Sequence, residues 1–329
     1  MMKSLKMGNL NIPLPIIQGG MGVGVSLSGL AAAVANEGGV GVISSAGLGL
    51  LYKKTGRDYL ESSIQGLKEE LQKARKLSLG VIGVNVMVAM TNFADMVKTA
   101  IAEKADIIFS GAGLPLDLPS FLTKESKTKL VPIVSSERAT RIICEKWKKN
   151  YDYLPDAIVV EGPKAGGHLG FKDNQIDDEH YSLEQIVPKV ITAVKIFEDS
   201  YSVKIPVIAA GGIYIGQNIY DILKLGSSGV QLGTRFVTTT ECDASDAFKA
   251  TYINAKAEDV KIINSPVGMP GRAISNAFID KVKLGYKHPI RCPFKCIHQS
   301  PFQRFQRKIR SWLCFRRYQC LPGQQNHFC

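Results

Sequence analysis

Eight short apolar runs recur along the chain, with helical stretches between them. The runs are Pro15–Gly19, Val40–Ser44, Val81–Val86, Asp106–Ser110, Leu130–Val134, Ala157–Glu161, Pro206–Ala210 and Gly229–Gly233. Most are almost continuously hydrophobic and rich in Val and Ile, which is typical of strands buried on both faces of a parallel sheet. The pattern predicts eight parallel strands.

Seven helices are predicted around these strands. They span Leu27–Asn36, Tyr59–Lys76, Asn92–Lys104, Glu137–Asn150, Leu183–Asp199, Gly216–Leu225 and Ala244–Ala255. This repetition fits an α/β fold of the TIM (β/α)8 barrel type better than a doubly wound sheet. A doubly wound sheet that bound a dinucleotide should carry Gly-x-Gly-x-x-Gly after its first strand, and the chain contains no such pattern.

Glycine clusters follow five of the predicted strands, at the carboxyl ends where a barrel carries its chemistry. The clusters lie within residues 19–24, 111–113, 162–170, 211–212 and 233. A single cluster could simply end a strand. Five clusters at corresponding positions favour a ligand, because glycine lets backbone amides approach it closely.

The last two clusters favour a phosphate site. Gly211 and Gly212 lead toward a helix that begins near Gly216, while Gly233 and Thr234 open the final turn. In barrels, the loops after strands seven and eight commonly bind phosphate together with a helix N-terminus. Backbone amides and the Thr234 hydroxyl would hold the phosphate. The neighbouring Arg235 either adds positive charge or faces the outer helices.

His168 is the candidate catalytic base. It lies in the glycine-rich stretch after the sixth strand, where little side-chain bulk would surround an imidazole at the barrel mouth. Histidine has an ordinary pKa of ~6.5, which suits proton abstraction near neutral pH. The other four histidines lack such a setting.

The net charge of +12 is concentrated in the last segment of the chain. Residues 287–329 hold nine Lys or Arg and no acidic residue, so residues 1–286 carry a net charge of only +3. A nucleic-acid surface on this main body is therefore not expected. We expect two parts: a barrel domain over residues 1–286 and a basic, cysteine-rich tail over residues 287–329.

Cysteine distribution follows the same division. Cys144 and Cys242 are the only cysteines of the body, which favours a reduced, cytoplasmic protein. No secretory signal is expected, because residues 1–12 lack a compact apolar region. The longest apolar stretch, Gly20–Leu51, is interrupted by polar residues, so no membrane-spanning helix is expected.

Three interpretations of the tail stay open. Its cysteines could bind zinc, although their spacing is loose, or its basic residues could bind nucleic acid or a membrane. The cysteines are Cys292, Cys296, Cys314, Cys320 and Cys329. We favour a third interpretation, in which a frameshift near Ile297 leaves a poorly folded end without function.

Four motifs together resemble the nitronate monooxygenase family, formerly called 2-nitropropane dioxygenases. They are Gln18–Gly22, Ala165–Gly170, Ala210–Ile213 and Gln231–Phe236. The family consists of FMN-dependent TIM barrels, and the FMN-dependent enoyl-ACP reductases are close relatives with nearly the same motifs. The resemblance covers roughly Ile12 to Val282.

The resemblance implies a role for each matching residue. Gly20, Met21 and Gly22 would lie against the flavin ring, Asn85 would contact the ring or its ribityl chain, and Gly166 and Gly167 would pack on the flavin. Gly211, Gly212, Gly233 and Thr234 would hold the FMN phosphate with help from Gln231, and His168 matches the catalytic base. Glu161 falls where many relatives have Gln. No metal is expected at this site.

Two departures from the family pattern leave the substrate open. One is the acid Glu161, and the other is Pro163-Lys164, which places a cation before the Ala-Gly-Gly-His motif. Lys164 would favour an anionic substrate, or it is a solvated loop charge.

Three functions are compatible with the resemblance. As in nitronate monooxygenases, His168 would deprotonate a nitroalkane, or a nitronate would bind directly, and O2 would complete the oxidation. As in the enoyl reductases, NADH or NADPH would reduce FMN and the flavin would reduce an enoyl thioester. The third function is non-catalytic flavin binding. The expected partners are small molecules, and a homodimer is left open.

Overall fold

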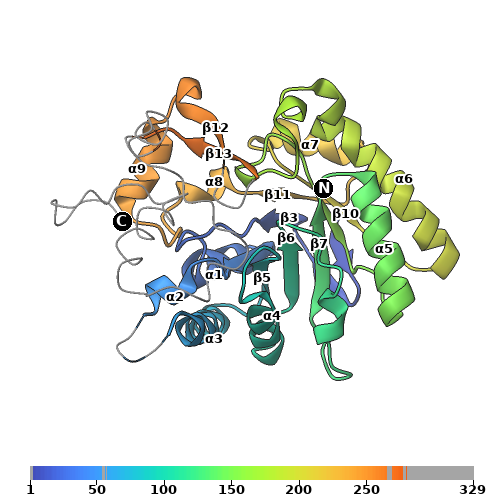
Figure 1. The fold of residues 1–329 in the computed structure, drawn as a ribbon, viewed down its shortest axis with the longest axis horizontal. Helices are drawn as coiled ribbons and strands as arrows, with labels where there is room; N and C mark the ends of the chain where they lie inside the picture. The colour runs from blue at the N-terminus through green and yellow to red at the C-terminus, as the bar shows by residue number, and fades with distance from the viewer. Residues whose placement is uncertain (1–2, 54–55, 57, 265–268, 277–278, 280–329) are drawn as a thin grey trace.

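A closed barrel of eight parallel strands forms the centre of the computed structural model, which describes residues 3–53, 56, 58–264, 269–276 and 279 (Figure 1). The strands are β3 (Ile16–Gln18), β4 (Val40–Ser44), β5 (Val81–Met87), β6 (Ile107–Gly111), β7 (Lys129–Val134), β8 (Ile158–Glu161), β10 (Val207–Ala210) and β11 (Gly229–Leu232). They follow each other around the barrel in chain order, and β11 closes it against β3. All eight predicted strands and the barrel are confirmed.

Helices surround this barrel, as Figure 1 shows. The longer ones are α1 (Ser28–Asn36), α3 (Tyr59–Leu77), α4 (Phe93–Ala102), α5 (Glu137–Tyr151), α6 (Leu183–Tyr201), α7 (Gly216–Lys224) and α9 (Asp246–Asn254). Each matches a predicted helix, with ends that differ by at most two residues. Local capping explains some of these ends: the Ser136 hydroxyl accepts a hydrogen bond from the Ala139 amide at 3.2 Å at the start of α5.

Alternating side chains divide the strands between two cores. Val42, Phe109 and Val159 belong to the core inside the barrel, whereas Ile43 and Ile108 belong to the core between the barrel and the helices. Because neighbouring residues of a strand point to opposite faces, the core to which one residue belongs also shows which way its neighbours along the strand point.

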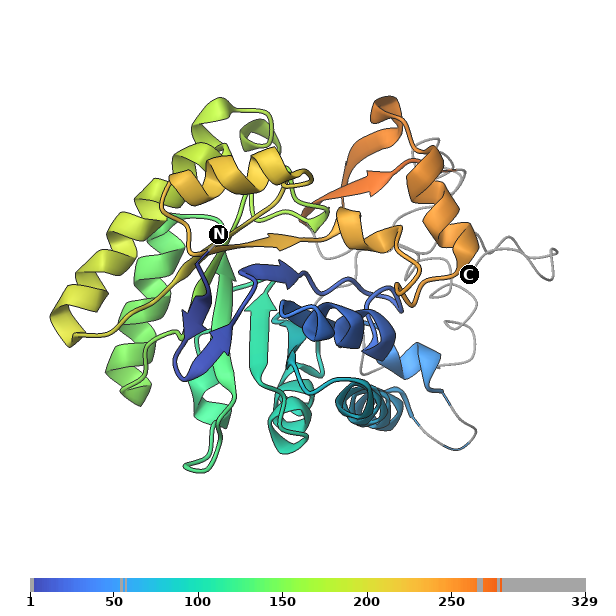
Figure 2. The ribbon, with the colours of Figure 1, turned by 180° about the vertical axis from the view of Figure 1, so that it is seen from behind.

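A hairpin that the sequence pattern did not predict covers the amino end of the barrel. Its strands are β1 (Leu5–Met7) and β2 (Leu10–Ile12), drawn in dark blue in Figure 2. Leu5, Met7 and Ile12 are almost completely buried in the core inside the barrel. The hairpin therefore excludes water from that end, and the opposite, carboxyl end carries the candidate site.

A second unpredicted feature is a three-stranded antiparallel sheet beside the barrel. Its order is β12 (Val260–Asn264), β13 (Pro270–Ile274) and β9 (Gly167–His168). Short helices α2 (Leu48–Leu51) and α8 (Thr234–Val237) were also not predicted. In both views α8, α9, β12 and β13 lie together on one side of the barrel (Figures 1 and 2).

The predicted tail, residues 287–329, lies outside the described residues, so its zinc, polyanion and frameshift interpretations stay predictions. Cys144 and Cys242 are buried free thiols. Within the described ranges, no helix combines the length and apolar character needed to cross a membrane. Those ranges also contain no group of three or more His, Cys, Asp or Glu that could hold a metal.

Candidate active site

Two polar residues, Glu161 and Gln231, point inward at the carboxyl end of the barrel. Ala210 is in register with Glu161 on one side and with Gln231 on the other, so the three form one row across neighbouring strands. Ala210 belongs to the core inside the barrel, and the residue preceding Glu161, Val160, faces the helices. Glu161 and Gln231 therefore point into the barrel mouth, with Cα atoms roughly 10 Å apart at the usual strand spacing.

Asn85 points into the same mouth from β5. Its strand neighbours Val84 and Val86 face the surrounding helices, so the alternation directs Asn85 inward. A Cβ on Gly20 would lie 2.2 Å from the Cβ of Asn85, and a Cβ on Gly22 would lie 2.7 Å from the Cβ of Ala46. The structure thus packs the loop after β3 directly on the ends of neighbouring strands.

Ser26 fixes the shape of that loop. Its hydroxyl accepts a hydrogen bond from the Met21 amide at 2.7 Å and donates one to the Met21 carbonyl at 3.1 Å. The Met21 side chain is buried in a cluster with residues of α1, α8 and α9. Its amide is already used by Ser26, so a ring-binding contact from Met21 would have to come from other atoms.

Two carboxylates hold the N-terminus of α1, directly after this loop. Asp243 accepts hydrogen bonds from the amides of Leu27, Gly29 and Leu30 at 2.7–3.1 Å. Glu70 accepts one from the Ser28 amide at 2.7 Å. Because the first amides of a helix lack helical partners, these bonds satisfy donors that burial would otherwise leave unpaired.

The pKa values of Asp243 and Glu70 are shifted in opposite directions. Burial raises the pKa of Asp243, although the amide hydrogen bonds oppose it. Burial also acts to raise the pKa of Glu70, but hydrogen bonds from Ser28, Tyr52 and Lys73 outweigh it and the net pKa is lowered. Burial and the Glu70 carboxylate raise the pKa of Tyr52 to about 12.

The predicted phosphate-binding loops are neighbours in space. Ala210 and Gln231 are in register, so Gly211 and Gly212 lie beside the chain that continues to Gly233 and Thr234. Gly211 and Gly212 have φ angles of +97° and +80°, which L side chains rarely adopt. Thr234 is exposed at the first position of α8, where the helix amides have no helical partner.

Arg235 lies over the loop after β10. Its guanidinium carbon is 5.1 Å from the centre of the Tyr214 ring. At the start of the helix α7, which follows the same loop, the Asn218 side chain accepts hydrogen bonds from the amides of Tyr214 and Ile215 at 3.2 and 3.1 Å. These two amides precede α7, which begins at Gly216, so their bonds do not decide between α7 and α8 as the helix that binds an anion.

His168 lies in strand β9 and not in an irregular loop as the sequence suggested. It is half-buried and in register with Gly271 of β13, and the Leu169 amide donates to the Pro270 carbonyl at 2.8 Å. Gly167, with a φ angle of +80°, is buried before it. A Cβ on Gly166 would meet no atom within 4 Å, so this face of the segment is open to a ligand.

Arg272 is the residue near the site that sequence reasoning missed. Its Nη1 atom donates hydrogen bonds to the carbonyls of Pro163 and Ala165, the latter at 3.2 Å. Burial lowers the pKa of the guanidinium, while the charge of Asp177 opposes that shift. More than a hundred residues separate Arg272 from its acceptors, so no local pattern could have identified the contact.

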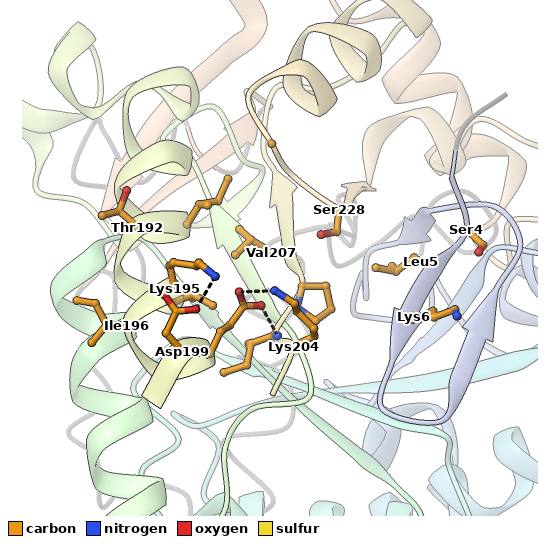
Figure 3. A pocket seen from close by; sticks show the side chains of 16 residues that line it. Ser4, Leu5, Lys6, Thr192, Lys195, Ile196, Asp199, Lys204, Val207 and Ser228 are labelled. Atoms are coloured by element: carbon orange, nitrogen blue, oxygen red, sulfur yellow. Dashed lines mark hydrogen bonds and ion pairs between the residues drawn. The ribbon is translucent and has the colours of Figure 1, made fainter. Parts of the chain in front are cut away.

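The open groove in Figure 3 lies away from the predicted site residues. It has a volume of about 740 Å³ and lies between β1, α6 and the amino ends of β10 and β11. Four of its charged side chains form two ion pairs: Lys195 with Asp199 at 2.5 Å and Lys204 with Glu198 at 3.3 Å. The groove contains none of the predicted flavin or catalytic residues, so we do not assign it to the chemistry.

Known proteins resemble this chain over most of its length. The family model for nitronate monooxygenase matches residues 3–299. A probable nitronate monooxygenase of Staphylococcus saprophyticus is 27% identical over 296 residues, which cover 84% of this chain and 79% of the relative. A dehydrogenase of Mycobacterium tuberculosis, named for a hydroxy-methyl-oxo-octahydro-indene carboxyl-CoA, is 28% identical over 84% of this chain and 67% of its own.

Solved structures give the same picture. FabK from Thermotoga maritima superposes with a TM-score of 0.66 at 29% identity and covers 85% of this chain and 77% of its own. The fold is also that of a nitroalkane oxidase from Streptomyces ansochromogenes, with a TM-score of 0.65 at 23% identity over 86% of this chain and 82% of that one.

The family match extends the resemblance beyond Val282. It ends at residue 299, two residues beyond Ile297, near which we predict a frameshift. It includes the motifs after β3, β8, β10 and β11 on which the resemblance depends. The chain belongs to the nitronate monooxygenase family, an enzyme family of flavin-dependent oxidoreductases.

Proposed function

We propose that this chain binds FMN at the carboxyl end of its barrel and oxidises alkyl nitronates with molecular oxygen. The proposal rests on one observation: three side chains and an open glycine segment converge at one end of the barrel. The side chains are Glu161, Gln231 and Asn85, which all point inward, and the glycine segment precedes His168. Family membership supplies the flavin chemistry.

The residues at this end fit FMN. Gly211, Gly212 and the start of α8 offer backbone donors for one phosphate, and glycine at both positive-φ positions lets the backbone approach it. The open face of Gly166 fits a planar ring. Gly20, Met21, Gly22, Asn85, Glu161 and Gly167 would surround the ring and ribityl chain, while Gln231, Gly233 and Thr234 would lie near the phosphate.

His168 is the proposed base. A neutral imidazole would accept the proton from the carbon beside the nitro group, which converts a neutral nitroalkane into its nitronate. A nitronate supplied directly needs no such transfer. Bound FMN would take up the electrons of the oxidation and pass them to oxygen.

Two measurements test this proposal. The purified protein should be yellow and release FMN on denaturation, and release of stoichiometric FAD would contradict the single-phosphate site. His168→Ala should retain FMN but lose turnover of neutral nitroalkanes by roughly 10²–10⁴-fold, the usual effect of removing a general base. Turnover of pre-formed nitronates should fall far less, and equal losses on both substrates would exclude His168 as the base.

A second function is the reduction of an enoyl thioester by NADH or NADPH, with FMN as the intermediate carrier. Two relatives favour it: the FabK structure at 29% identity, and the Mycobacterium tuberculosis dehydrogenase, whose name specifies a CoA thioester. Consumption of NADH or NADPH with an enoyl thioester in the absence of oxygen separates the two functions, because the nitronate reaction requires oxygen and no nicotinamide.

A further inference from the structure

We propose that Arg272 is a positioning residue for His168, acting through the loop that joins β8 to β9. This inference rests on the proposed role of His168 as the base. Its basis is a set of contacts between β13 and the segment from Gly162 to Leu169.

Two kinds of contact hold the segment to β13. The Arg272 side chain donates to the carbonyls of Pro163 and Ala165, before the two glycines. The backbone of Arg272 is in register with Gly167, and Gly271 is in register with His168. One residue of β13 therefore contacts the segment on both sides of Gly166, which has no Cβ to restrict its backbone.

The opposite side of the segment is also restricted. The Ala165 amide donates to the Gly162 carbonyl at 3.1 Å, which closes a turn. A Cβ on Gly211 would lie 3.0 Å from that carbonyl and 3.1 Å from that amide. The turn is thus packed against the predicted phosphate loop on one side and bonded to Arg272 on the other.

The charge of Arg272 makes these contacts stronger than ordinary ones. Hydrogen bonds from a charged donor are roughly twice as strong as neutral ones. The guanidinium is half-buried, so losing it would leave two carbonyls to find other partners in a confined space. Without it the glycine segment would gain freedom and His168 would lose its fixed position relative to the substrate.

The test uses Arg272→Ala and Arg272→Lys in the FMN-loaded full chain. Arg272→Ala should lower kcat on a neutral nitroalkane by roughly 10²-fold, the effect of a misplacement of about 1 Å in a catalytic group. The KM and the turnover of a pre-formed nitronate should change far less, and FMN should stay bound. Arg272→Lys should recover part of the lost rate, because an ammonium can donate to the same carbonyls without the planar geometry.

The matched control is Lys261→Ala. Lys261 lies on β12, in register with Ala273, so the change removes a cation from the same sheet. This variant should retain normal rates on both substrates. A loss in Lys261→Ala as large as that in Arg272→Ala would show that any change to the sheet is harmful and would overturn the specific role of Arg272.

A double variant shows whether Arg272 acts through His168. In the His168→Ala background, Arg272→Ala should cause no further loss on the nitroalkane, because residues that act as a unit are not additive. A full additional loss, equal losses on nitroalkane and nitronate, or loss of FMN from both Arg272 variants would overturn the inference. If His168→Ala itself affects both substrates equally, His168 is not the base, and this inference fails together with that assignment. If His168→Ala lowers turnover of the nitroalkane far more than that of the nitronate but Arg272→Ala does not, the proposed function stands and this inference alone is wrong.

Discussion

A Cβ atom built on Gly20 would lie 2.2 Å from the Cβ atom of Asn85, so the loop after β3 contacts the end of β5 without room for any side chain. Real Cβ atoms do not approach each other so closely, and the Asn85 Cβ cannot move independently of its strand. Two residues that are predicted to contact the flavin, from segments far apart in the sequence, therefore lie against each other.

Gly20→Ala should destabilise the protein and weaken FMN binding together. The added methyl would displace either the loop or β5, at a cost of about 1–3 kcal/mol in the free energy of unfolding. Thermal unfolding of the apo protein and fluorescence titration with FMN measure the two effects. Gly216→Ala is the control, because a Cβ there meets no atom within 4 Å. Unchanged stability in Gly20→Ala would show that the loop can move away from Asn85.

Gly212→Ala should reduce affinity for FMN more than it reduces stability. The φ angle of +80° would strain an alanine by about 1–2 kcal/mol, and its Cβ would lie 2.9 Å from that of Lys164, beside the proposed phosphate site. Gly226→Ala is a matched control, since Gly226 has a φ angle of +101° but follows α7 at the other end of the barrel. Equal FMN affinity in the two variants would place the phosphate elsewhere.

Glu70 should make stability depend on acidic pH. Its pKa lies below the ordinary value of 4.5 in the folded protein, so the unfolded chain binds more protons between the two pKa values. Its contribution is therefore complete above about pH 4.5 and is lost as the pH falls through the folded pKa. Chemical unfolding of Glu70→Gln across this range should show a weaker pH dependence than the unsubstituted protein.

The control for this experiment is Glu69→Gln. Glu69 lies on the same helix and accepts a hydrogen bond from Gln65 at 3.0 Å, away from the N-terminus of α1. Its substitution should leave the loss of unfolding free energy at acidic pH the same as in the unsubstituted protein. A Glu70→Gln profile that runs parallel to that of the unsubstituted protein would mean that Glu70 is not the group responsible.

Ser62→Ala should stabilise the protein by about 1 kcal/mol. The Ser62 hydroxyl is buried on α3 and has no hydrogen-bond partner in the described part of the chain, and alanine is the better helix former. Ser63→Ala should have the opposite effect, because the Ser63 hydroxyl donates to the Tyr59 carbonyl at 2.7 Å. Denaturant unfolding compares the two, and a destabilised Ser62→Ala would reveal a partner for that hydroxyl.

The barrel could be predicted because each strand and helix is encoded locally. The sequence pattern predicts a strand over Val40–Ser44, and the strand β4 of the structure has the same ends. Its five consecutive residues are all buried, and such a run is visible in the sequence alone. The hairpin at the amino end was missed because its three-residue strands are too short to show a period. Its burial depends on the barrel that it covers.

The candidate site was predicted only in part for the same reason. The glycine motifs are contiguous in sequence, so their residues could be named before their positions were known. The contact between Gly20 and Asn85 and the pairing of β9 with β13 join segments far apart in the chain. Arg272 and Asp243 act through such contacts and carry no local signature of their role.

Oxygen uptake by the FMN-loaded protein in the presence of an alkyl nitronate, without any NADH or NADPH, tests the central claim most directly. We predict saturable oxygen consumption that depends on the nitronate and is not increased by the nicotinamide. Absence of oxygen uptake with nitronates, together with anaerobic consumption of NADH or NADPH when an enoyl thioester is added, would contradict the proposed nitronate oxidation and identify the chain as a thioester reductase.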